Sequence, residues 1–196
     1  SKPFIADKVS PEGTIVCSSG EITNKNYVDL SFTVTDNYTS SNDIEMQLII
    51  DGVEGIWESF APNKTVVFDK TEGTHSVSVR FKDKSNNISD LYTVDFVYDI
   101  TPPEIYISYE PAVPTSGNVI ATATTEASGR IIGENVYEFL ENGFYTFTAI
   151  DEAGNISQKD AVVNWIDKTS PTISFISKEF DNKKHREAKI TINCID

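Results

Sequence analysis

The sequence predicts an all-β chain built from antiparallel β-sandwiches, and three observations support this fold class. Apolar and polar residues alternate with a period of two along most runs, as half-buried strands require. Clusters of Gly, Pro, Asn and Asp interrupt the runs at intervals of about 8–12 residues, a spacing typical of a sandwich. No run carries a convincing helical period. The nearest candidate, NVYEFLEN (135–142), is followed by an Asn-Gly turn and is therefore expected to be a strand.

The individual strands follow from this alternation. In each predicted strand every second residue is apolar and is expected to point into a core: Val28, Leu30, Phe32 and Val34; Ile44, Met46, Leu48 and Ile50; Val77, Val79 and Phe81; Val119, Ala121 and Ala123; Tyr145, Phe147 and Ala149. The second of these runs ends in Asp51-Gly52, a dipeptide that favours a tight hairpin turn.

An internal repeat divides the chain into modules. The segment FKDKSNNISD (81–90) returns as AIDEAGNISQ (149–158), and at the same offset YDITPPEI (98–105) returns as IDKTSPTI (166–173). The same Asp-x-x-x-Pro junction also occurs at 7–11. These matches predict the end of a preceding module, two complete modules and the start of an incomplete third one: residues 1–7, 8–99, 100–167 and 168–196.

Charge and composition exclude several classes of function. Thirty acidic residues face sixteen basic ones, and the net charge of −14 argues against a nucleic-acid partner. No apolar run approaches the roughly 18 residues that a membrane-spanning helix needs, so no membrane insertion is expected. Cys17 and Cys194 lie near opposite ends of the chain and are expected to be isolated thiols. No zinc-binding spacing of Cys and His is present.

Several motifs match a known family. The second module carries GNVIATATT, ENGFYTFTAID, a DEAGN turn and a closing NWIDKTSP, and the first carries IIDGVEGIWESFAP, GTHSVSVRFKD and YDITPP. On these residues the chain resembles the tandem bacterial immunoglobulin-like (Big-type) repeats of large Gram-positive cell-surface or secreted proteins. One departure is KSNN (84–87) in place of AGN, where Asn86 is expected to adopt the left-handed conformation that Gly154 supplies in the other copy.

The resemblance implies an elongated array of immunoglobulin-like β-sandwiches, outside the cell and either secreted or attached to the cell wall. It implies a monomer whose partners are the neighbouring modules of the same chain, with cell-wall polysaccharide or a host or environmental glycan as a further partner. Its most direct functional implication is a non-catalytic structural spacer or stalk. Two alternatives stay open: an adhesive or carbohydrate-binding module, and an accessory region of a secreted glycan-degrading enzyme.

Repeated aspartates are the candidate metal ligands. Asp83 and Asp151 occupy the repeated turn, whereas Asp99 and Asp167 close the two modules. Carboxylates gathered at a junction could hold Ca²⁺, which takes six to eight oxygen ligands. The alternative is that each carboxylate accepts hydrogen bonds from its own turn. The acid-rich loop 36–43 is a weaker calcium candidate, and no other cofactor is expected.

Aromatic and histidine residues provide the remaining candidates. Trp57 and Phe60 could form a platform on which a sugar ring stacks, and the alternative for both is packing within the module. His75 lies on the same strand face as Val77, and His185 lies in an expected turn. No nucleophile motif or phosphate-binding loop is present, so the chain is not expected to be an enzyme.

Overall fold

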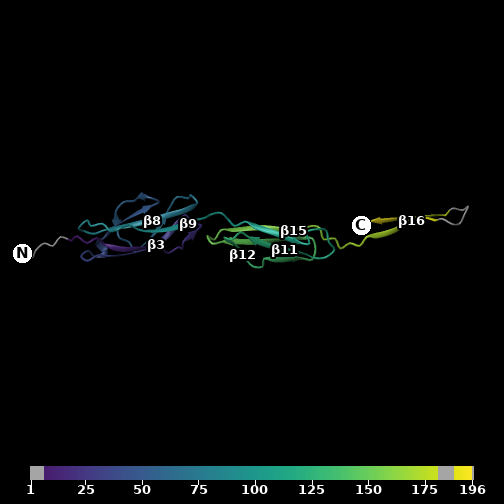
Figure 1. Cartoon of the computed structure of the whole chain (residues 1–196), viewed down its shortest axis with the longest axis horizontal. Helices are drawn as coiled ribbons and strands as arrows, with labels where there is room; N and C mark the ends of the chain where they lie inside the picture. The colour runs from purple at the N-terminus through teal and green to yellow at the C-terminus, as the bar shows by residue number, and fades with distance from the viewer. Residues whose placement is uncertain (1–6, 181–187, 196) are drawn as a thin grey trace, which may run out of the picture. The chain divides into compact units, whose positions relative to one another are not determined.

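The structure is a computed structural model that describes residues 7–180 and 188–195 (Figure 1). Every described element is a β-strand apart from one short 3-10 helix, η1 (Ser41–Asp43). Within these residues no helix has the length and apolar character needed to cross a membrane. Cα distances divide the chain into two compact units, and the short segments 125–130 and 149–157 group with the first unit. The all-β fold class is confirmed.

The first sandwich pairs a three-stranded sheet with a six-stranded one. The smaller sheet has the order β1 (Glu12–Cys17), β3 (Tyr27–Thr35), β7 (Asn63–Val67), and both of its ladders are antiparallel. The larger sheet has the order β2 (Ile22–Thr23), β9 (Tyr92–Tyr98), β8 (Gly73–Lys82), β4 (Glu45–Ile50), β5 (Val53–Glu54), and β6 (Glu58–Ser59) pairs with β4. Figure 1 shows β3 in one layer and β8 and β9 in the other.

The two sheets enclose one hydrophobic core, as the alternation predicts. The predicted inward residues of β3 and β8 are all buried. Ile44, directly before β4, is also buried, as are Met46 and Leu48 within it, whereas Ile50 at the end of β4 is only partly buried. Phe81, Phe96 and Leu30 are among the largest fully buried side chains. The Asp51-Gly52 turn after β4 is confirmed, because both residues have positive φ angles of 48° and 79°.

The second sandwich has two three-stranded sheets. One has the order β10 (Ile105–Glu110), β11 (Val119–Thr125), β13 (Val136–Phe139); the other has the order β12 (Gly129–Ile131), β14 (Gly143–Asp151), β15 (Ile156–Val163). The predicted inward residues of β11 are buried, and so are Phe147 and Ala149 of β14. Tyr145 is partly buried and its ring stacks on Tyr137 at a centroid distance of 4.0 Å. The strand predicted for 135–142 is confirmed as β13.

A separate two-stranded antiparallel sheet follows, formed by β16 (Thr172–Phe180) and β17 (Ala188–Ile195). It lies in the segment where the sequence predicts the start of a third module. His185 lies outside the described residues, as do residues 181–187 of that segment and residues 1–6 of the predicted preceding module.

Both sandwiches also contain a short parallel pairing that the sequence pattern did not predict. In the first, β2 pairs in parallel with the end of β9, and Asp99 N donates to Thr23 O at 3.0 Å. In the second, Thr115 forms an isolated parallel bridge with Ile166, and Asp167 N donates to Thr115 O at 2.9 Å. Segments of one or two residues show no period, so alternation cannot reveal them.

Candidate functional site

The repeated turn is the best-defined polar structure of the chain, and its first copy follows β8. Asp83 is 3% exposed, and its Oδ1 accepts hydrogen bonds from Ser85 N at 2.8 Å and Asn87 N at 2.7 Å. Its Oδ2 accepts from Asn87 Nδ2 at 2.7 Å. Asn86 has a φ of 66°, which confirms the left-handed conformation predicted for it.

The second copy keeps both hydrogen bonds between the Asp and the Asn, but its third bond comes from the residue three positions after the Asp rather than two. Asp151 Oδ1 accepts from Gly154 N and Asn155 N, both at 2.8 Å, and Asp151 Oδ2 accepts from Asn155 Nδ2 at 2.9 Å. Gly154 has a φ of 93°, so it takes the place that Asn86 has in the first copy. The repeated residues therefore encode one local structure: a turn whose first residue, an aspartate, accepts hydrogen bonds from the main chain of the turn.

The asparagine of each copy also reaches a second chain segment. Asn87 Nδ2 donates to the main-chain oxygen of Asp7 at 3.3 Å, and Asn155 Nδ2 donates to the main-chain oxygen of Asp99 at 2.9 Å. Each asparagine thus connects its own turn to the aspartate that precedes the Pro of the junction. The repeated Asp and the repeated Asn act together in both copies.

The junction aspartates share a second feature, a hydrogen bond to the residue two positions later. In each case the carboxylate Oδ1 accepts from a main-chain N–H: Asp7 from Val9 at 3.1 Å, Asp99 from Thr101 at 2.9 Å and Asp167 from Thr169 at 2.8 Å. The hydrogen bonds to Thr169 lower the pKa of Asp167, and burial opposes them weakly.

Three carboxylates from distant chain positions meet beside the first copy of the turn. A ligand oxygen from each of Asp7, Asp36 and Asp83 lies within 4.8 Å of the others. Among the described residues this is the one such group of three acids, histidines or cysteines. Burial alone would raise the pKa of Asp36, but hydrogen bonds from the main chain of Thr39 and Tyr38 outweigh it and lower the pKa.

The structure thus brings one predicted calcium ligand, Asp83, into a cluster of acids. Asp99, Asp151 and Asp167 do not belong to any such cluster of described residues, and calcium binding there stays a prediction. The sequence analysis treated Asp7 as a junction residue and Asp36 as part of the loop 36–43, its weaker calcium candidate. The available signal was positional: Asp7 precedes a junction Pro, and Asp36 directly follows a strand.

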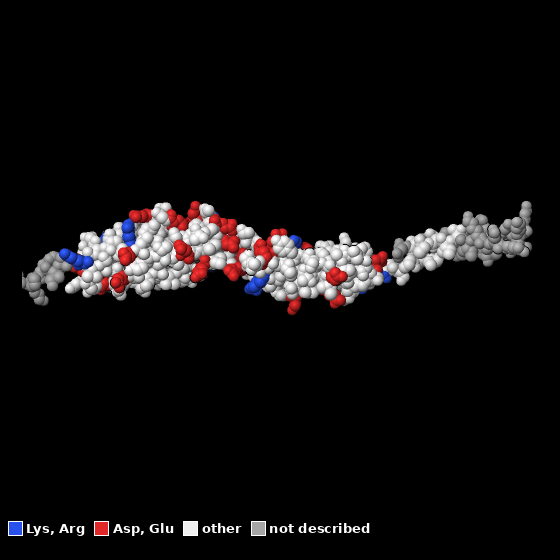
Figure 2. Space-filling view, viewed as in Figure 1, with Lys and Arg blue, Asp and Glu red and all other residues white. Residues whose placement is uncertain are grey.

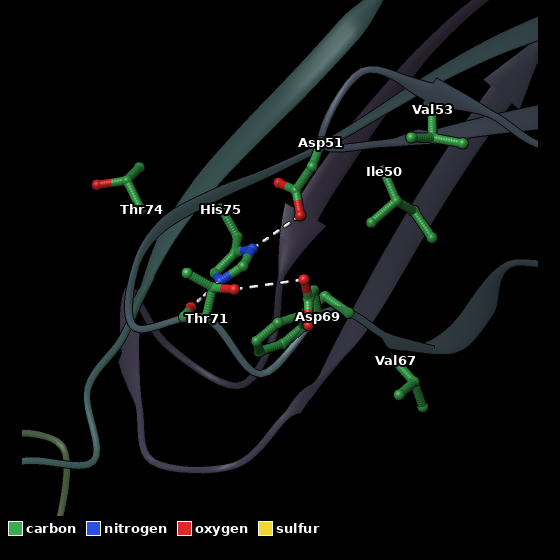
Figure 3. Close-up of a pocket in the computed structure, with 9 residues that line it drawn as sticks. Ile50, Asp51, Val53, Val67, Asp69, Thr71, Thr74 and His75 are labelled. Carbon is green, nitrogen blue, oxygen red and sulfur yellow. Dashed lines mark hydrogen bonds and ion pairs between the residues drawn. The ribbon is translucent and has the colours of Figure 1, made fainter.

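His75 lies at the wall of an open pocket of about 530 Å³ at one end of the first sandwich (Figure 3). Its side chain is buried, its Nδ1 lies 2.7 Å from Asp51 Oδ2, and its Nε2 lies 2.7 Å from Thr71 O. Both ring nitrogens therefore have protein partners. Its ring also stacks on Phe96 at a centroid distance of 5.9 Å.

Burial, hydrogen bonds and nearby charges together shift the pKa values of both members of this pair. Burial alone would lower the pKa of His75, but the hydrogen bonds to Asp51 and Thr71 and the charges of Asp51 and Asp69 outweigh it and raise the pKa. Burial alone would raise the pKa of Asp51, but the hydrogen bonds from His75 and Ser76 N lower it. The buried side chain of His75 is thus paired with the exposed carboxylate of Asp51 at the edge of the pocket.

The two predicted sugar-stacking residues have different surroundings. Phe60 packs against the core, and its ring meets Phe81 edge-on at a centroid distance of 6.0 Å. Trp57 is partly buried, and its ring is covered by Lys82 Nζ at 4.4 Å and Arg80 Cζ at 5.7 Å. On the face of the molecule drawn in Figure 2, acidic side chains are spread over both sandwiches rather than gathered at one site.

Comparisons with known proteins give limited information. No family model and no curated protein matches the sequence. Among solved structures, the chain is similar to fibronectin(III)-like modules of Clostridium thermocellum CbhA, with 16% identity and a TM-score of 0.32 over 44% of this chain and 96% of that one. It is also similar to the central fibronectin-III array of RIM-binding protein, with 11% identity and a TM-score of 0.36 over 89% and 76% of the two chains.

A third similar structure is a beta-glucuronidase of Parabacteroides merdae, with 9% identity and a TM-score of 0.34. The match covers 80% of this chain but only 25% of the enzyme. Because the sequence identities and TM-scores are this low, the fold assignment depends on the sheet topology of this chain and not on the matches. Two tandem sandwiches of antiparallel sheets, each around its own core, have the immunoglobulin-like architecture that the sequence predicts.

Proposed function

We propose that the chain is a non-catalytic spacer made of immunoglobulin-like modules within a larger extracellular bacterial protein, either secreted or attached to the cell wall. One observation carries this proposal: the same Asp–Asn turn recurs with the same hydrogen bonds, to Asp7 in one copy and to Asp99 in the other. A repeated structural connection is what an array of modules needs, and it requires no reactive group.

The proposal includes the module boundaries, with complete modules at 8–99 and 100–167 and part of a third from residue 168. The two sheet pairs and their separate sets of buried residues support these boundaries. The neighbouring modules of the same chain are then the main partners. A glycan of the cell wall or of a host is the alternative partner.

The surroundings of the aromatic residues favour the spacer over a carbohydrate-binding module. A sugar ring needs an open aromatic face, whereas Phe60 contacts the core and Lys82 lies over Trp57. His75, the one histidine among the described residues, is buried, and both of its ring nitrogens have protein partners. These contacts favour packing roles over ligand binding or proton transfer.

Co-sedimentation with insoluble glycans tests the proposal. The full chain is mixed with cellulose, chitin, xylan or peptidoglycan, and the bound fraction is measured beside the Trp57→Ala variant. A spacer remains in the supernatant with every polymer. Retention of the unmodified chain on one polymer, lost in the variant, would overturn the spacer proposal and establish the first module as a glycan receptor.

Calorimetry adds a test of module independence. Substitution of the fully buried Phe81 by Leu removes packing from the core of the first sandwich alone. A spacer of independent modules is expected to lose stability in one unfolding transition while the other stays unchanged. An equal shift of all transitions would contradict independent modules.

A further inference from the structure

The cluster of Asp7, Asp36 and Asp83 joins three parts of the chain that are far apart in sequence. Asp7 precedes β1, Asp36 follows β3 and Asp83 follows β8. Ionised carboxylates held this close repel one another, and a cation among them would relieve that repulsion. None of the described Lys, Arg and His side chains forms an ion pair with any of the three.

Two of these carboxylates each have a buried oxygen without a partner. In Asp7 and Asp36 the Oδ1 atom accepts from the main chain, from Val9 N in the first and from Tyr38 N and Thr39 N in the second. The Oδ2 atom of each is shielded from solvent and has no hydrogen-bond partner. A buried charged oxygen left in this state is costly, and a bound cation would satisfy both oxygens at once.

The donor set indicates the kind of cation. The three ligands are carboxylate oxygens, which hard cations prefer over the nitrogen and sulfur ligands of zinc or copper sites. Bonds of about 2.3–2.6 Å let one Ca²⁺ ion bridge oxygens up to about 5 Å apart, whereas bonds of about 2.0–2.1 Å limit Mg²⁺ to about 4 Å. Oxygens within 4.8 Å of one another lie within reach of a single Ca²⁺ ion, and Ca²⁺ accepts protein ligands in less regular geometry than Mg²⁺ does.

We propose that Asp7, Asp36 and Asp83 bind one Ca²⁺ ion at the first copy of the repeated turn, with water completing its coordination. Asp36 is the residue that makes this copy different from the second. The corresponding acid after β11 is Glu126, which is exposed and accepts a hydrogen bond from Glu104 N at 3.1 Å. Asp99 and Asp151 therefore lack the third carboxylate that completes the first cluster.

Titration calorimetry with CaCl₂ on the full chain, after removal of metal with a chelator, tests the site. One ion per chain is expected, with a dissociation constant of about 10⁻⁴–10⁻³ M, the range of extracellular calcium modules. Asp36→Asn keeps an oxygen that can accept from Tyr38 N and Thr39 N, so the loop is preserved while the charge is lost. This variant is expected to bind at least about tenfold more weakly. The matched control, Glu126→Gln, is expected to bind like the unmodified chain.

Thermal unfolding distinguishes a variant that has lost the calcium site from one that no longer folds. Calcium is expected to raise the melting temperature of the unmodified chain and of Glu126→Gln but not that of Asp36→Asn. In chelator, Asp36→Asn is expected to melt at or above the unmodified chain, because one of three like charges is gone. No heat and no melting shift with Ca²⁺ on the order of 10 mM, ten times the weakest expected constant, would overturn the proposal. Unchanged calcium binding by Asp36→Asn, or equal binding of MgCl₂, would also overturn it.

Discussion

Asn155 donates its side-chain amide to the main-chain oxygen of Asp99 at 2.9 Å, across 56 residues of sequence. The same amide donates to Asp151 Oδ2 at 2.9 Å, so a single side chain uses both of its N–H groups to connect a turn with a distant segment. A short repeated motif thereby encodes a tertiary contact as well as a local turn.

Asn155→Ala is expected to lower the free energy of unfolding by about 1–2 kcal/mol, because two hydrogen bonds donated by a buried side chain are lost together. Thermal or urea unfolding measures this change. The control is Asn164→Ala, an exposed asparagine just after β15. Equal stability of the two variants would indicate that the contact with Asp99 contributes nothing.

Gly13→Ala is expected to destabilise the first sandwich by about 1–3 kcal/mol, because a methyl group there overpacks the core. A Cβ at this position would lie 2.5 Å from Thr33 O and closer still to the ring of Phe81. Gly143→Ala is the matched control, since a Cβ there meets nothing within 4 Å. Urea unfolding of both variants checks the prediction, and a Gly13→Ala chain as stable as the control would contradict the close packing.

The His75–Asp51 pair is expected to make stability depend on pH. The pKa of His75 is raised, so its contribution is complete below the unfolded value of about 6.5 and is lost as pH rises through the higher folded value. The pKa of Asp51 is lowered, so its contribution is present above about pH 4 and is lost as pH falls through the lower folded value. The contribution of this pair to stability is therefore greatest between about pH 4 and 6.5.

Asp51→Asn tests that dependence. The variant is expected to be less stable at pH 6 by about 0.5–1 kcal/mol, a modest value because Asp51 is partly exposed. Its free energy of unfolding is also expected to fall less between about pH 6 and 8 than that of the unmodified chain. Melting curves across this range measure both effects. Asp95→Asn, on an exposed position of β9, is the control. An unchanged pH profile in Asp51→Asn would exclude the ion pair as its origin.

The two thiols are expected to differ in reactivity. Both are free; Cys194 is exposed, whereas Cys17 is partly buried and its Sγ–H donates to Gly20 O at 3.1 Å. Alkylation followed by mass spectrometry is expected to label Cys194 several-fold faster, because access to reagent controls the rate. Cys194→Ser should leave only the slow reaction. Equal rates at both sites would contradict the difference in burial.

Alternation predicted the cores well because burial on one face is a local property of a strand. Val28, Leu30 and Phe32 point inward for the same reason that they recur at every second position. The left-handed residue Asn86 was also predictable, since an asparagine in that turn can replace glycine. Period and turn chemistry are both properties of neighbouring residues.

Other features depend on which strands become neighbours. Asp7, Asp36 and Asp83 meet only because the ends of β3 and β8 and the chain before β1 lie at one end of the first sandwich, and no sequence spacing encodes that. The cover over Trp57 has the same origin, because Lys82 lies on a different strand. These contacts depend on how the strands are arranged in space, which the alternation of apolar and polar residues does not determine.

The parallel pairing of β2 with β9 has a mechanical consequence. Within the larger sheet β2 comes first in the chain and β9 comes last, so tension that reaches this sheet along the chain pulls the two parallel strands in opposite directions along their length. Hydrogen bonds arranged side by side in this way share the load and fail together, whereas a hairpin pulled open from its end loses them one at a time. Thr115 and Ile166 have the same parallel relation in the second sandwich. We therefore expect these few main-chain hydrogen bonds to resist shear in each sandwich.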